Sequence, residues 1–462
     1  MTDIKVSIII TAHNYGKWLP QAVDSALGQN FESFEVIVVN DGSTDNTPQI
    51  LDNYKDNKRL VVVNTDGIGL SGACNRGIEK SHGKYIVRLD ADDWFDPNLV
   101  LVLANFLDFN PNIGLVFCDY IDTDVYGDII NYNRRESIND EIRILDRSAP
   151  AAGAMYRRQC YDTIGGYNED IRYQEDYDFW LKIVEKFQVR NISLPLMFRR
   201  LHNNSMSRNF VARMKTRRYV KKEFLKTHRQ EQESGSVLAI IPARADTING
   251  EKIVLTQFDD SNLLTRCINK VKKINAIDRV VVFTDDFEIS EVALNQGAEV
   301  PYLRNKTSTS SAVPVEQGFQ ELLHHLKLED NYQPDIIVLA TPLSPFILCE
   351  HITEALDSME IFKSDSVIAV SEDLTYHWQV GKNGLKAVGY KKRVVKQEKH
   401  LIFKESGGIY VLKVKNLYNG DNFLGKMVGH IILSPQEALR INNEYDLWVA
   451  QKMAEEPEQW CK

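Results

Sequence analysis

The sequence predicts an α/β protein with two domains, each built on a mainly parallel sheet. Its 462 residues suffice for about two or three domains of ordinary size. Two β-branched runs, at residues 6–10 and 237–241, each end in polar residues and lead into a helical pattern and another apolar strand. Strand, helix and strand in this order form a βαβ unit, which has parallel strands and a right-handed crossover. The second run therefore opens a new sheet.

The composition is that of an ordinary folded chain. Hydrophobic residues make up 43% and charged residues 26%, and the net charge of −9 argues against a general nucleic-acid binder. No apolar run reaches the length of about 18 residues that spans a bilayer, and the first residues lack the features of a secretory signal. The six cysteines lack paired or C-x-x-C spacing, which favours reduced thiols. We therefore expect a cytoplasmic protein that binds no nucleic acid.

In the first domain, a helix is expected over residues 18–27 and a strand over residues 35–39, because their apolar residues follow helical and continuous spacing respectively. Open α/β sheets bind ligands at the carboxyl ends of their strands. Acidic residues follow predicted strands or begin a predicted helix at three places: Asp41; Asp90, Asp92 and Asp93; and Glu175, Asp176 and Asp178.

These acidic groups have two interpretations. Clustered carboxylates repel one another and are commonly held by a cation, which for oxygen ligands alone would be Mg²⁺ or Mn²⁺ bridging to a phosphorylated substrate. Each group by itself is equally explained as a helix N-cap or a turn, and for Asp41 before Gly42 that interpretation is favoured. The three groups taken together favour a binding site.

A basic segment separates the two domains. Residues 208–229 hold nine Lys and Arg against the single acid Glu223, and their apolar residues predict an amphipathic helix. Residues 231–236 then resemble a short linker. The helix either packs one face on its own domain or contacts anionic lipid or a phosphorylated lipid acceptor. The expected domain bounds are 1–208, 209–235 and 236–462, and the last domain should have a helix over 263–273 and a strand over 279–283.

Residues 1–208 resemble a family 2 glycosyltransferase with the GT-A fold. The matching segments, in the family's order, are VSIIITAHNY at 6–15, VNDGSTDNT at 39–47, GLSGACNRG at 69–77, DADD at 90–93, GGYNE at 165–169, ED at 175–176 and RLHNNSMS at 200–207. His13, where Tyr or Phe is common, and Cys74 are mild departures. The resemblance implies inverting transfer of a sugar from a nucleotide-sugar, of the UDP type, to a glycan or lipid-linked acceptor in bacterial surface polysaccharide synthesis.

The same resemblance implies roles for individual residues. Asp176 would be the general base, and Asp92 with His202 would hold Mn²⁺ or Mg²⁺ on the donor diphosphate. Asp41 would contact the uracil edge and Asp90 the ribose. The full set expected to bind the nucleotide-sugar is Thr11, His13, Asn14, Asp41, Asn75, Asp90 and Arg200. The small residues of 150–155 form either the floor of the acceptor pocket or tight core packing.

Residues 236–462 resemble an acylneuraminate cytidylyltransferase, the family that makes CMP-activated sialic-type sugars. The matching segments are IIPAR at 240–244, RVVVFTD at 279–285, LATPLSP at 339–345, SGGIY at 406–410 and INNEYD at 441–446. Both halves together would make two Rossmann-like nucleotide-binding domains joined by a basic helical linker. Cytidylyltransferases of this type commonly dimerise, so a homodimer through residues 236–462 is expected.

The departures from this second family fall on residues that handle phosphate. Asp246 and Ile248 stand in the loop that usually carries Ser-Lys-Gly, Phe346 replaces an arginine, and Arg440 and Asn442 replace two Mg²⁺ carboxylates. A triphosphate and its pyrophosphate leaving group need neutralising charge, so the loss of these groups favours an inactive domain. A nucleotide-like pocket remains from Arg244, Lys252 and Asp285.

Three alternatives stay open at this point. The chain is a bifunctional enzyme that also makes a CMP-nonulosonate from CTP, or its second domain binds a regulatory nucleotide. The third alternative, of another class, is a non-catalytic scaffold that binds a nucleotide-sugar. The complete acid set at positions 41, 90, 92 and 176 argues against the scaffold.

Overall fold

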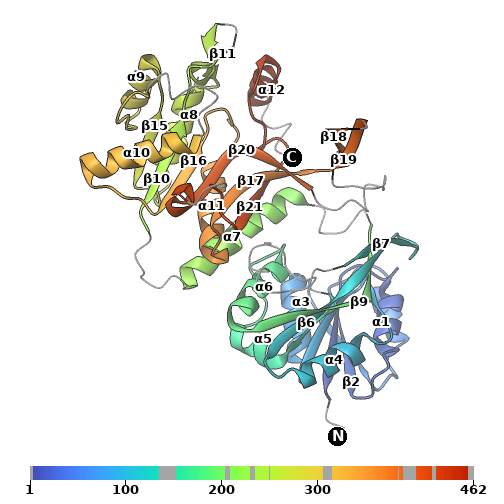
Figure 1. Cartoon of the computed structure of the whole chain (residues 1–462). Coiled ribbons are helices and arrows are strands. Elements are labelled where there is room, and N and C mark those ends of the chain that lie inside the picture. The colour runs from blue at the N-terminus through green and yellow to red at the C-terminus, as the bar shows by residue number, and fades with distance from the viewer. Residues whose placement is uncertain are drawn as a thin grey trace. The chain divides into compact units, whose positions relative to one another are not determined.

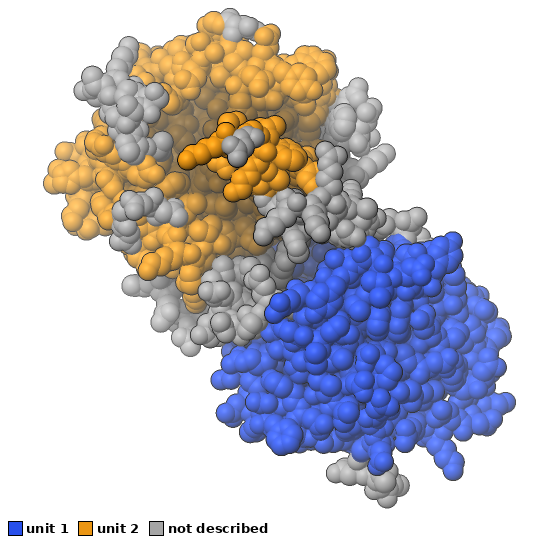
Figure 2. Space-filling model, turned by 45° about the vertical axis from the view of Figure 1, so that its right-hand side comes forward, with its two compact units in different colours: residues 1–142, 147–220, 394–399 blue, residues 143–146, 221–393, 400–462 orange. Residues whose placement is uncertain are grey.

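The computed structural model describes residues 4–134, 152–202, 209–228, 235–248, 250–304, 315–382, 384–388, 402–418 and 423–455. These residues form two compact units, one up to Val220 and one from Lys221 onward (Figure 2). Each unit has its own sheet (Figure 1). Each unit also has its own hydrophobic core. The predicted two-domain α/β fold is confirmed. The division falls inside a helix, so the expected bounds of 208 and 236 stay a prediction.

In the described part of the first unit, nine strands form one mixed sheet with helices on both faces. The strands are β1 (Val6–Ala12), β2 (Phe34–Asp41), β3 (Leu60–Thr65), β4 (Tyr85–Asp90), β5 (Trp94–Phe95), β6 (Ile113–Thr123), β7 (Ile129–Asn133), β8 (Ala154–Arg157) and β9 (Gln188–Arg200). The helices are α1 (Leu19–Leu27), α2 (Thr47–Asp52), α3 (Gly69–Glu79), α4 (Leu99–Phe109), α5 (Arg158–Ile164) and α6 (Glu175–Lys186).

The strand order β3-β2-β1-β4-β8-β6-β9-β5, with β7 paired to β6, places β2 and β4 on either side of β1. All three of these strands run parallel. Because the sheet grows in opposite directions from β1, the loops after β1, β2 and β4 diverge and leave room for a ligand at their carboxyl ends. The predicted site residues Thr11, Asp41 and Asp90 all lie there.

The sequence pattern explains this part of the fold. Every residue of β1 and β2 is buried, as expected for parallel strands covered on both faces. Side chains of β1 alternate between two core clusters, one shared with α1 and α4 and the other with α3 and α6. The buried residues of α1 recur at helical spacing and are Leu19, Ala22, Val23 and Ala26. The expected helix and strands of this βαβ unit are therefore confirmed.

The second unit is built around a six-stranded sheet of order β15-β10-β16-β20-β17-β21 in its described part. Its strands are β10 (Val237–Pro242), β15 (Arg279–Phe283), β16 (Ile336–Ala340), β17 (Ser366–Asp373), β20 (Ile402–Lys413) and β21 (Val428–Leu433). The helices are α8 (Leu263–Lys272), α9 (Phe287–Asn295), α10 (Val315–Asp330), α11 (Cys349–Phe362) and α12 (Glu444–Glu455). Because β10 is parallel to both β15 and β16, the second predicted βαβ unit is confirmed.

Within the described ranges of this unit, three short hairpins lie outside the sheet. They pair β11 (Thr247–Ile248) with β12 (Glu251–Lys252), β13 (Gln257–Phe258) with β14 (Ser261–Asn262), and β18 (His377–Gly381) with β19 (Gly384–Val388). In the last hairpin, Trp378 faces Ala387 and Val380 faces Leu385 across the strands. Val380 is 84% exposed and Leu385 is 68% exposed, so one face of this hairpin is apolar and open.

The basic helix α7 (Phe210–His228) forms as expected, but its burial differs from the prediction. Met214, Val220 and Leu225 are buried, whereas Val211 is exposed. Two of the basic residues, Arg217 and Lys221, are also buried, which a purely basic outer face would not allow. The Arg217 guanidinium stacks 4.3 Å from the ring centre of Tyr177, and Lys221 donates a 3.0 Å hydrogen bond to Ser358. No helix in the described ranges is long and apolar enough to cross a bilayer.

Candidate active site

The candidate site begins where parallel strands end side by side. In the sheet register, Thr11 of β1 pairs with Val39 of β2 and with Asp90 of β4. Thr11 is 8% exposed, so only the rim of its side chain can meet a ligand. The parallel register therefore places Thr11 beside Asp90, and Asp41 lies at the end of the neighbouring strand β2.

Asp41, the last residue of β2, is buried and held by the chain itself. Its Oδ1 accepts hydrogen bonds from the Thr65 hydroxyl and the Ile68 amide, both at 2.7 Å, and its Oδ2 accepts one from the Gly69 amide at 2.8 Å. The last two donors lie at the start of α3, where a carboxylate is favoured. Capping is thus one role of Asp41, and contact with uracil stays a prediction.

The loop after β1 is fixed by His13 and Asn14. The His13 Nδ1 lies 2.5 Å from the carbonyl oxygen of Asp41, so Nδ1 carries the ring hydrogen and donates it. Asn14 adopts a left-handed conformation with φ 61°, and its side-chain oxygen accepts a 2.7 Å hydrogen bond from the Thr44 amide. Both residues are exposed at the rim and can meet a nucleotide there.

Asp90 is joined to the start of α6 by a buried arginine. The Arg88 Nε donates to Asp90 Oδ1 at 2.8 Å, and its Nη1 donates to Glu175 Oε1 at 2.9 Å. Arg88 is 4% and Glu175 6% exposed. Burial raises the pKa of Asp90; Arg88 opposes this shift, and the charges of Asp92 and Asp176 add to it. The negative charge of Asp176 therefore acts on the Asp90 carboxyl.

The predicted base, Asp176, lies in the first turn of α6 and is partly exposed. Its Oδ1 accepts a 2.9 Å hydrogen bond from the Tyr177 amide. Burial raises the pKa of Glu175, its neighbour; Arg88 opposes that shift and the Asp176 charge adds to it. Gln174, which precedes the helix, is left-handed at φ 58°, a conformation that costs a non-glycine residue about 1–2 kcal/mol.

Asp92 and His202 meet at the rim of the same site. The His202 Nε2 lies 2.7 Å from Asp92 Oδ2, and the His202 ring centre lies 4.5 Å from that of Trp18. Burial, followed by the charges of Asp92, Asp90 and Asp93, raises the pKa of the Tyr15 hydroxyl above its usual value. The acidic loop 90–93 is thus walled by aromatic rings.

Arg200 holds the acidic loop 90–93 through hydrogen bonds. Its backbone amide donates to Asp93 Oδ1 at 2.8 Å, its Nε to the Asp92 carbonyl at 3.1 Å, and its Nη1 to the Val125 carbonyl at 3.1 Å. The guanidinium also stacks 4.7 Å from the Trp94 ring centre. Because Arg200 is 3% exposed and donates to protein acceptors, the structure gives it a positioning role, and contact with the diphosphate stays a prediction.

Asn75, which was expected to bind the nucleotide-sugar, makes four hydrogen bonds within the chain. Its Nδ2 donates to the Tyr167 carbonyl and to Glu169, both at 2.9 Å, and its Oδ1 accepts from the Tyr161 hydroxyl and the Tyr167 amide, both at 3.0 Å. These four bonds use the whole capacity of a side-chain amide. Asn75 therefore ties α3 to the segment 165–169, and its contact with a nucleotide-sugar stays a prediction.

The expected metal ligands form a pair. Among the residues with described positions, no three His, Cys, Asp or Glu side chains gather in a metal-binding arrangement. Mg²⁺ and Mn²⁺ commonly take one or two protein ligands and complete their shell with water and substrate phosphate. The oxygen of Asp92 and the nitrogen of His202, 2.7 Å apart, fit such an open site if the ion replaces their mutual hydrogen bond.

In the second unit, the three residues of the expected pocket lie near the carboxyl ends of β10 and β15. Lys252 is held by two carboxylates at the start of α9, 2.6 Å from Asp286 and 2.8 Å from Glu288. Asp285 has a buried carboxylate oxygen without a hydrogen-bond partner in the described part of the chain. Burial lowers the pKa of Arg304; Asp285 opposes this shift and Arg244 adds to it, which places the three near one another.

The substituted positions of the second unit agree with the departures seen in sequence. Asn442 Nδ2 donates to the Arg440 carbonyl and to Asp446, at 3.0 and 3.3 Å. Arg440 lies over Gly407, where an added Cβ would clash with its Nη1. That these two residues replace metal carboxylates of the family stays a prediction from the resemblance.

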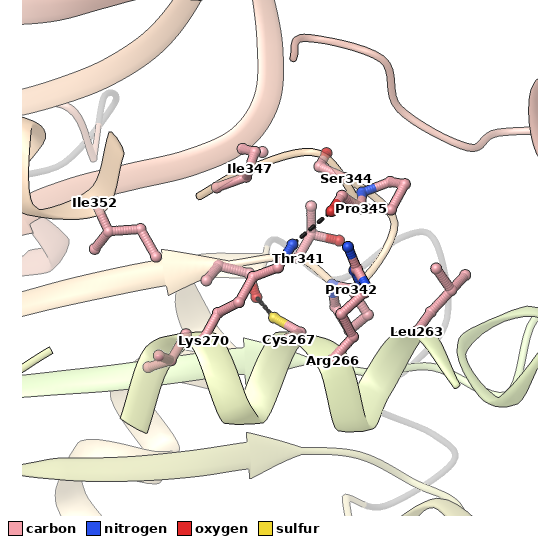
Figure 3. A pocket seen from close by; sticks show the side chains of 13 residues that line it. Leu263, Arg266, Cys267, Lys270, Thr341, Pro342, Ser344, Pro345, Ile347 and Ile352 are labelled. Atoms are coloured by element: carbon pink, nitrogen blue, oxygen red, sulfur yellow. Dashed lines mark hydrogen bonds between the residues drawn. The ribbon is translucent and has the colours of Figure 1, made fainter. Parts of the chain in front are cut away.

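A separate pocket lies between α8 and the loop after β16 (Figure 3). Arg266, Cys267 and Lys270 line it from α8, and Thr341 and Ser344 line it from the loop. Burial, together with the charge of Arg266, lowers the pKa of Lys270 to about 8, and the Lys270 Nζ donates to the Pro345 carbonyl.

All five cysteines in the described residues are free, which confirms for them the expectation of reduced thiols.

The sequence interpretation missed Arg88 and Trp18. The signal for Arg88 was a charged residue inside an apolar strand, since a buried arginine needs carboxylate partners. For Trp18 the pattern gave a helical core position, whereas the ring lies against His202 at the site.

Comparison with known proteins supports both resemblances. Residues 7–165 match the family described as glycosyl transferase family 2, and residues 238–455 match the family described as cytidylyltransferase. The first match includes Thr11, Asp41, Asp90 and Asp92 and ends before Asp176 and His202.

Relatives match the first half of the chain. The chondroitin synthase of Pasteurella multocida strain Pm70 is 30% identical over 206 residues, which is 44% of this chain and 21% of the relative. A chondroitin synthase of Escherichia coli is 28% identical over 203 residues, 44% of this chain and 30% of the relative. An uncharacterized glycosyltransferase of Haemophilus influenzae is 28% identical over 220 residues, 44% and 67% of the two chains. The chain thus spans less than a third of the two synthases.

Solved structures similar to the model include Staphylococcus aureus TarS 1–349 in complex with UDP-GlcNAc, at 22% identity and TM-score 0.43, covering 49% of this chain and 68% of that one. Another is the mannosyltransferase PcManGT from Pyrobaculum calidifontis in complex with GDP-Man and Mn²⁺, at 19% identity and TM-score 0.40, covering 49% and 65%. By these two matches, residues 7–165 of the chain are similar to glycosyl transferase family 2 and residues 238–455 are similar to the cytidylyltransferase family.

Proposed function

We propose that the first unit is an inverting, divalent-metal-dependent glycosyltransferase that moves a sugar from a nucleotide-sugar, of the UDP type, to a glycan or lipid-linked acceptor. One observation supports this proposal: Arg88 bonds both to Asp90, at the end of β4, and to Glu175, the residue before Asp176 at the start of α6. The relatives named as synthases and glycosyltransferases support a role in bacterial surface polysaccharide synthesis.

In this proposal the residues of the chain bind and orient both substrates. The loops after β1 and β2, with His13, Asn14 and Asp41, form the nucleoside side, and Asp90 accepts hydrogen bonds from the ribose. Asp176 accepts the proton of the acceptor hydroxyl as that oxygen attacks the anomeric carbon from the face opposite the leaving group. A single displacement of this kind inverts the anomeric configuration.

Asp92 and His202 would hold the metal ion. A bound Mn²⁺ or Mg²⁺ supplies positive charge that stabilises the departing nucleoside diphosphate. The aromatic wall of Trp18 and Tyr15 beside this pair limits water at the rim.

The function is tested with a panel of UDP-, GDP- and CMP-sugars, with and without Mn²⁺, by measuring release of the nucleotide and the anomeric configuration of the product. The proposal predicts Mn²⁺-dependent release from a nucleoside-diphosphate sugar and inversion at the anomeric carbon. If the chain binds a nucleotide-sugar with full affinity and releases no nucleotide with any acceptor, it is a scaffold.

The second unit is proposed to be an inactive cytidylyltransferase-like domain. Lys252, which could have replaced the missing lysine, is neutralised by Asp286 and Glu288, so a triphosphate would meet a net negative charge there. An active cytidylyltransferase that makes a CMP-nonulosonate is the second candidate, favoured by the cluster of Arg244, Arg304 and Asp285.

We further propose that the chain forms a homodimer through residues 236–462. The open apolar face of the hairpin β18–β19 supports this, because a two-stranded hairpin is marginally stable until its apolar face is covered. Replacing Val380 and Leu385 together by Glu should convert a dimer to a monomer in light scattering, with Lys386→Glu on the opposite face as the control. A monomeric wild-type chain at high concentration would contradict the proposal.

A cytoplasmic position with contact at the inner face of the membrane is also proposed, through the exposed basic residues of α7, Lys215, Lys222 and Lys226. In co-sedimentation, the wild-type chain should bind vesicles that contain anionic lipid. A variant in which these three lysines are replaced by Gln should stay unbound. Equal retention of both proteins would contradict membrane contact through α7.

A further inference from the structure

Arg88 bridges two parts of the candidate site: Asp90, which is proposed to bind the donor, and Glu175, which precedes the proposed base Asp176. Arg88 lies on β4 two residues before Asp90, so both side chains leave the strand on the same face. The Nε and Nη2 atoms each lie 2.8 Å from Asp90 Oδ1, and Nη1 lies 2.9 Å from Glu175 Oε1. One planar guanidinium thus joins a strand-end carboxylate to Glu175, the first residue of α6, which lies 87 positions after Arg88 in the sequence.

The start of α6 needs such an anchor. Gln174 is in the left-handed region, its buried side-chain oxygen has no hydrogen-bond partner within the described residues, and no side chain caps the helix. A residue in this conformation persists when surrounding contacts determine it. Asp176 is the second residue of that helix, so its carboxylate moves with the first turn.

The charges of Asp90 and Glu175 favour an arginine at position 88. Burial alone would lower the pKa of Arg88, but Asp90, Cys74 and Glu175 raise it well above its usual value. The guanidinium is therefore a fixed cation among carboxylates at every working pH. Lysine, with a single nitrogen, cannot reproduce the two-sided fork.

We propose that Arg88 is a positioning residue that sets Asp176 against the donor by clamping Glu175 to Asp90. Arg88 touches neither substrate in this role; it acts through the two carboxylates. The proposal rests on the proposed glycosyltransferase function, and it adds the element that fixes the base relative to the donor.

The first test uses Glu175→Gln, which keeps an acceptor for Arg88 and removes the charge of the clamp. We expect kcat to fall about tenfold and the donor KM to stay within about threefold, because the change affects the orientation of the base and not donor binding. Arg88→Lys should lower kcat further. In the double variant of Arg88→Met with Glu175→Gln, the loss in kcat should be no larger than in Arg88→Met alone.

The matched control is Arg157→Lys. Arg157 is a partly buried arginine of the neighbouring strand β8, which donates to the carbonyls of Ile113 and Leu107 away from the site. The Arg157→Lys variant should have the wild-type kcat at temperatures below the melting temperature of the variant. Multiplicative losses in the double variant, or equal losses of kcat in the Arg157 control, would overturn the proposal.

A second readout does not depend on activity. Hydrogen–deuterium exchange of the amides in the first turns of α6 should speed up at least tenfold in Arg88→Lys and stay at the wild-type rate in Arg157→Lys. Wild-type exchange of these amides in Arg88→Lys would overturn the clamp even if the enzyme is a glycosyltransferase. If the wild-type chain transfers no sugar, the proposed function fails, while the exchange experiment still decides whether Arg88 holds α6.

Discussion

His202 and Asp92, 110 residues apart in sequence, lie with Nε2 and Oδ2 2.7 Å from each other. The contact joins the second residue after β9 to the acidic loop after β4. Each side chain is a potential ligand of a divalent ion, so this pair is where the proposed metal ion would bind.

Asp92→Ala should abolish Mn²⁺-dependent binding of UDP, because it removes the carboxylate that would hold the ion. His202→Ala should weaken that binding about tenfold, because one ligand and its contact with Trp18 are lost. Calorimetry with and without Mn²⁺ checks both effects. Asp96→Ala, an acid in the same segment, is the control, and unchanged Mn²⁺-dependent affinity in Asp92→Ala would contradict the assigned ion site.

Asn75→Ala should reduce stability and leave nucleotide affinity unchanged. The substitution removes four hydrogen bonds and leaves buried partners unsatisfied, which costs about 2–4 kcal/mol of the free energy of unfolding. Thermal unfolding and UDP calorimetry on the same sample measure the two effects. A stable variant with weakened UDP binding would instead support contact of Asn75 with the nucleotide.

Glu437 should make the second unit sensitive to acid. Although burial alone would raise it, the hydrogen bond and charge of His351 lower the pKa of Glu437 to about 2. A carboxyl whose pKa is depressed in the folded state stabilises that state above its unfolded value, near 4.5, and loses this contribution as the pH falls towards 2.

Glu437→Gln should therefore lower the free energy of unfolding by roughly 1–3 kcal/mol at pH 7, and the difference from wild type should shrink below pH 4. Denaturant unfolding at several pH values measures this difference. Glu350→Gln, an exposed acid on the same helix as His351, should have little effect. A difference that stays constant down to pH 2.5 would show that the lowered pKa of Glu437 is not its cause.

The second unit should give no calorimetric heat with CTP and Mg²⁺ in the full chain, while UDP with Mn²⁺ binds normally. The reason is that Asp286 and Glu288 neutralise Lys252. The resemblance adds that Arg440 and Asn442 would stand in place of two metal carboxylates. Micromolar affinity for CTP would instead favour the bifunctional enzyme.

The sequence was informative where burial or chain order decides the structure. β1 and β10 were predictable because continuous β-branched runs suit strands covered on both faces, and the acidic residues at strand ends followed from the parallel order. Partnerships across long separations were not predictable. The hydrogen-bond partners of Asn75 lie 86 to 94 residues away, and the burial of Arg217 and Lys221 depends on what α7 packs against.

The central claim is that Asp176 is the base of a sugar transfer, and Asp176→Asn tests it most directly. Glu185→Gln, an exposed acid near the other end of α6, is the matched control. The variant should bind UDP with Mn²⁺ as wild type does and lose turnover by at least about 10²-fold, while Glu185→Gln keeps it. Near wild-type turnover in Asp176→Asn would contradict the account.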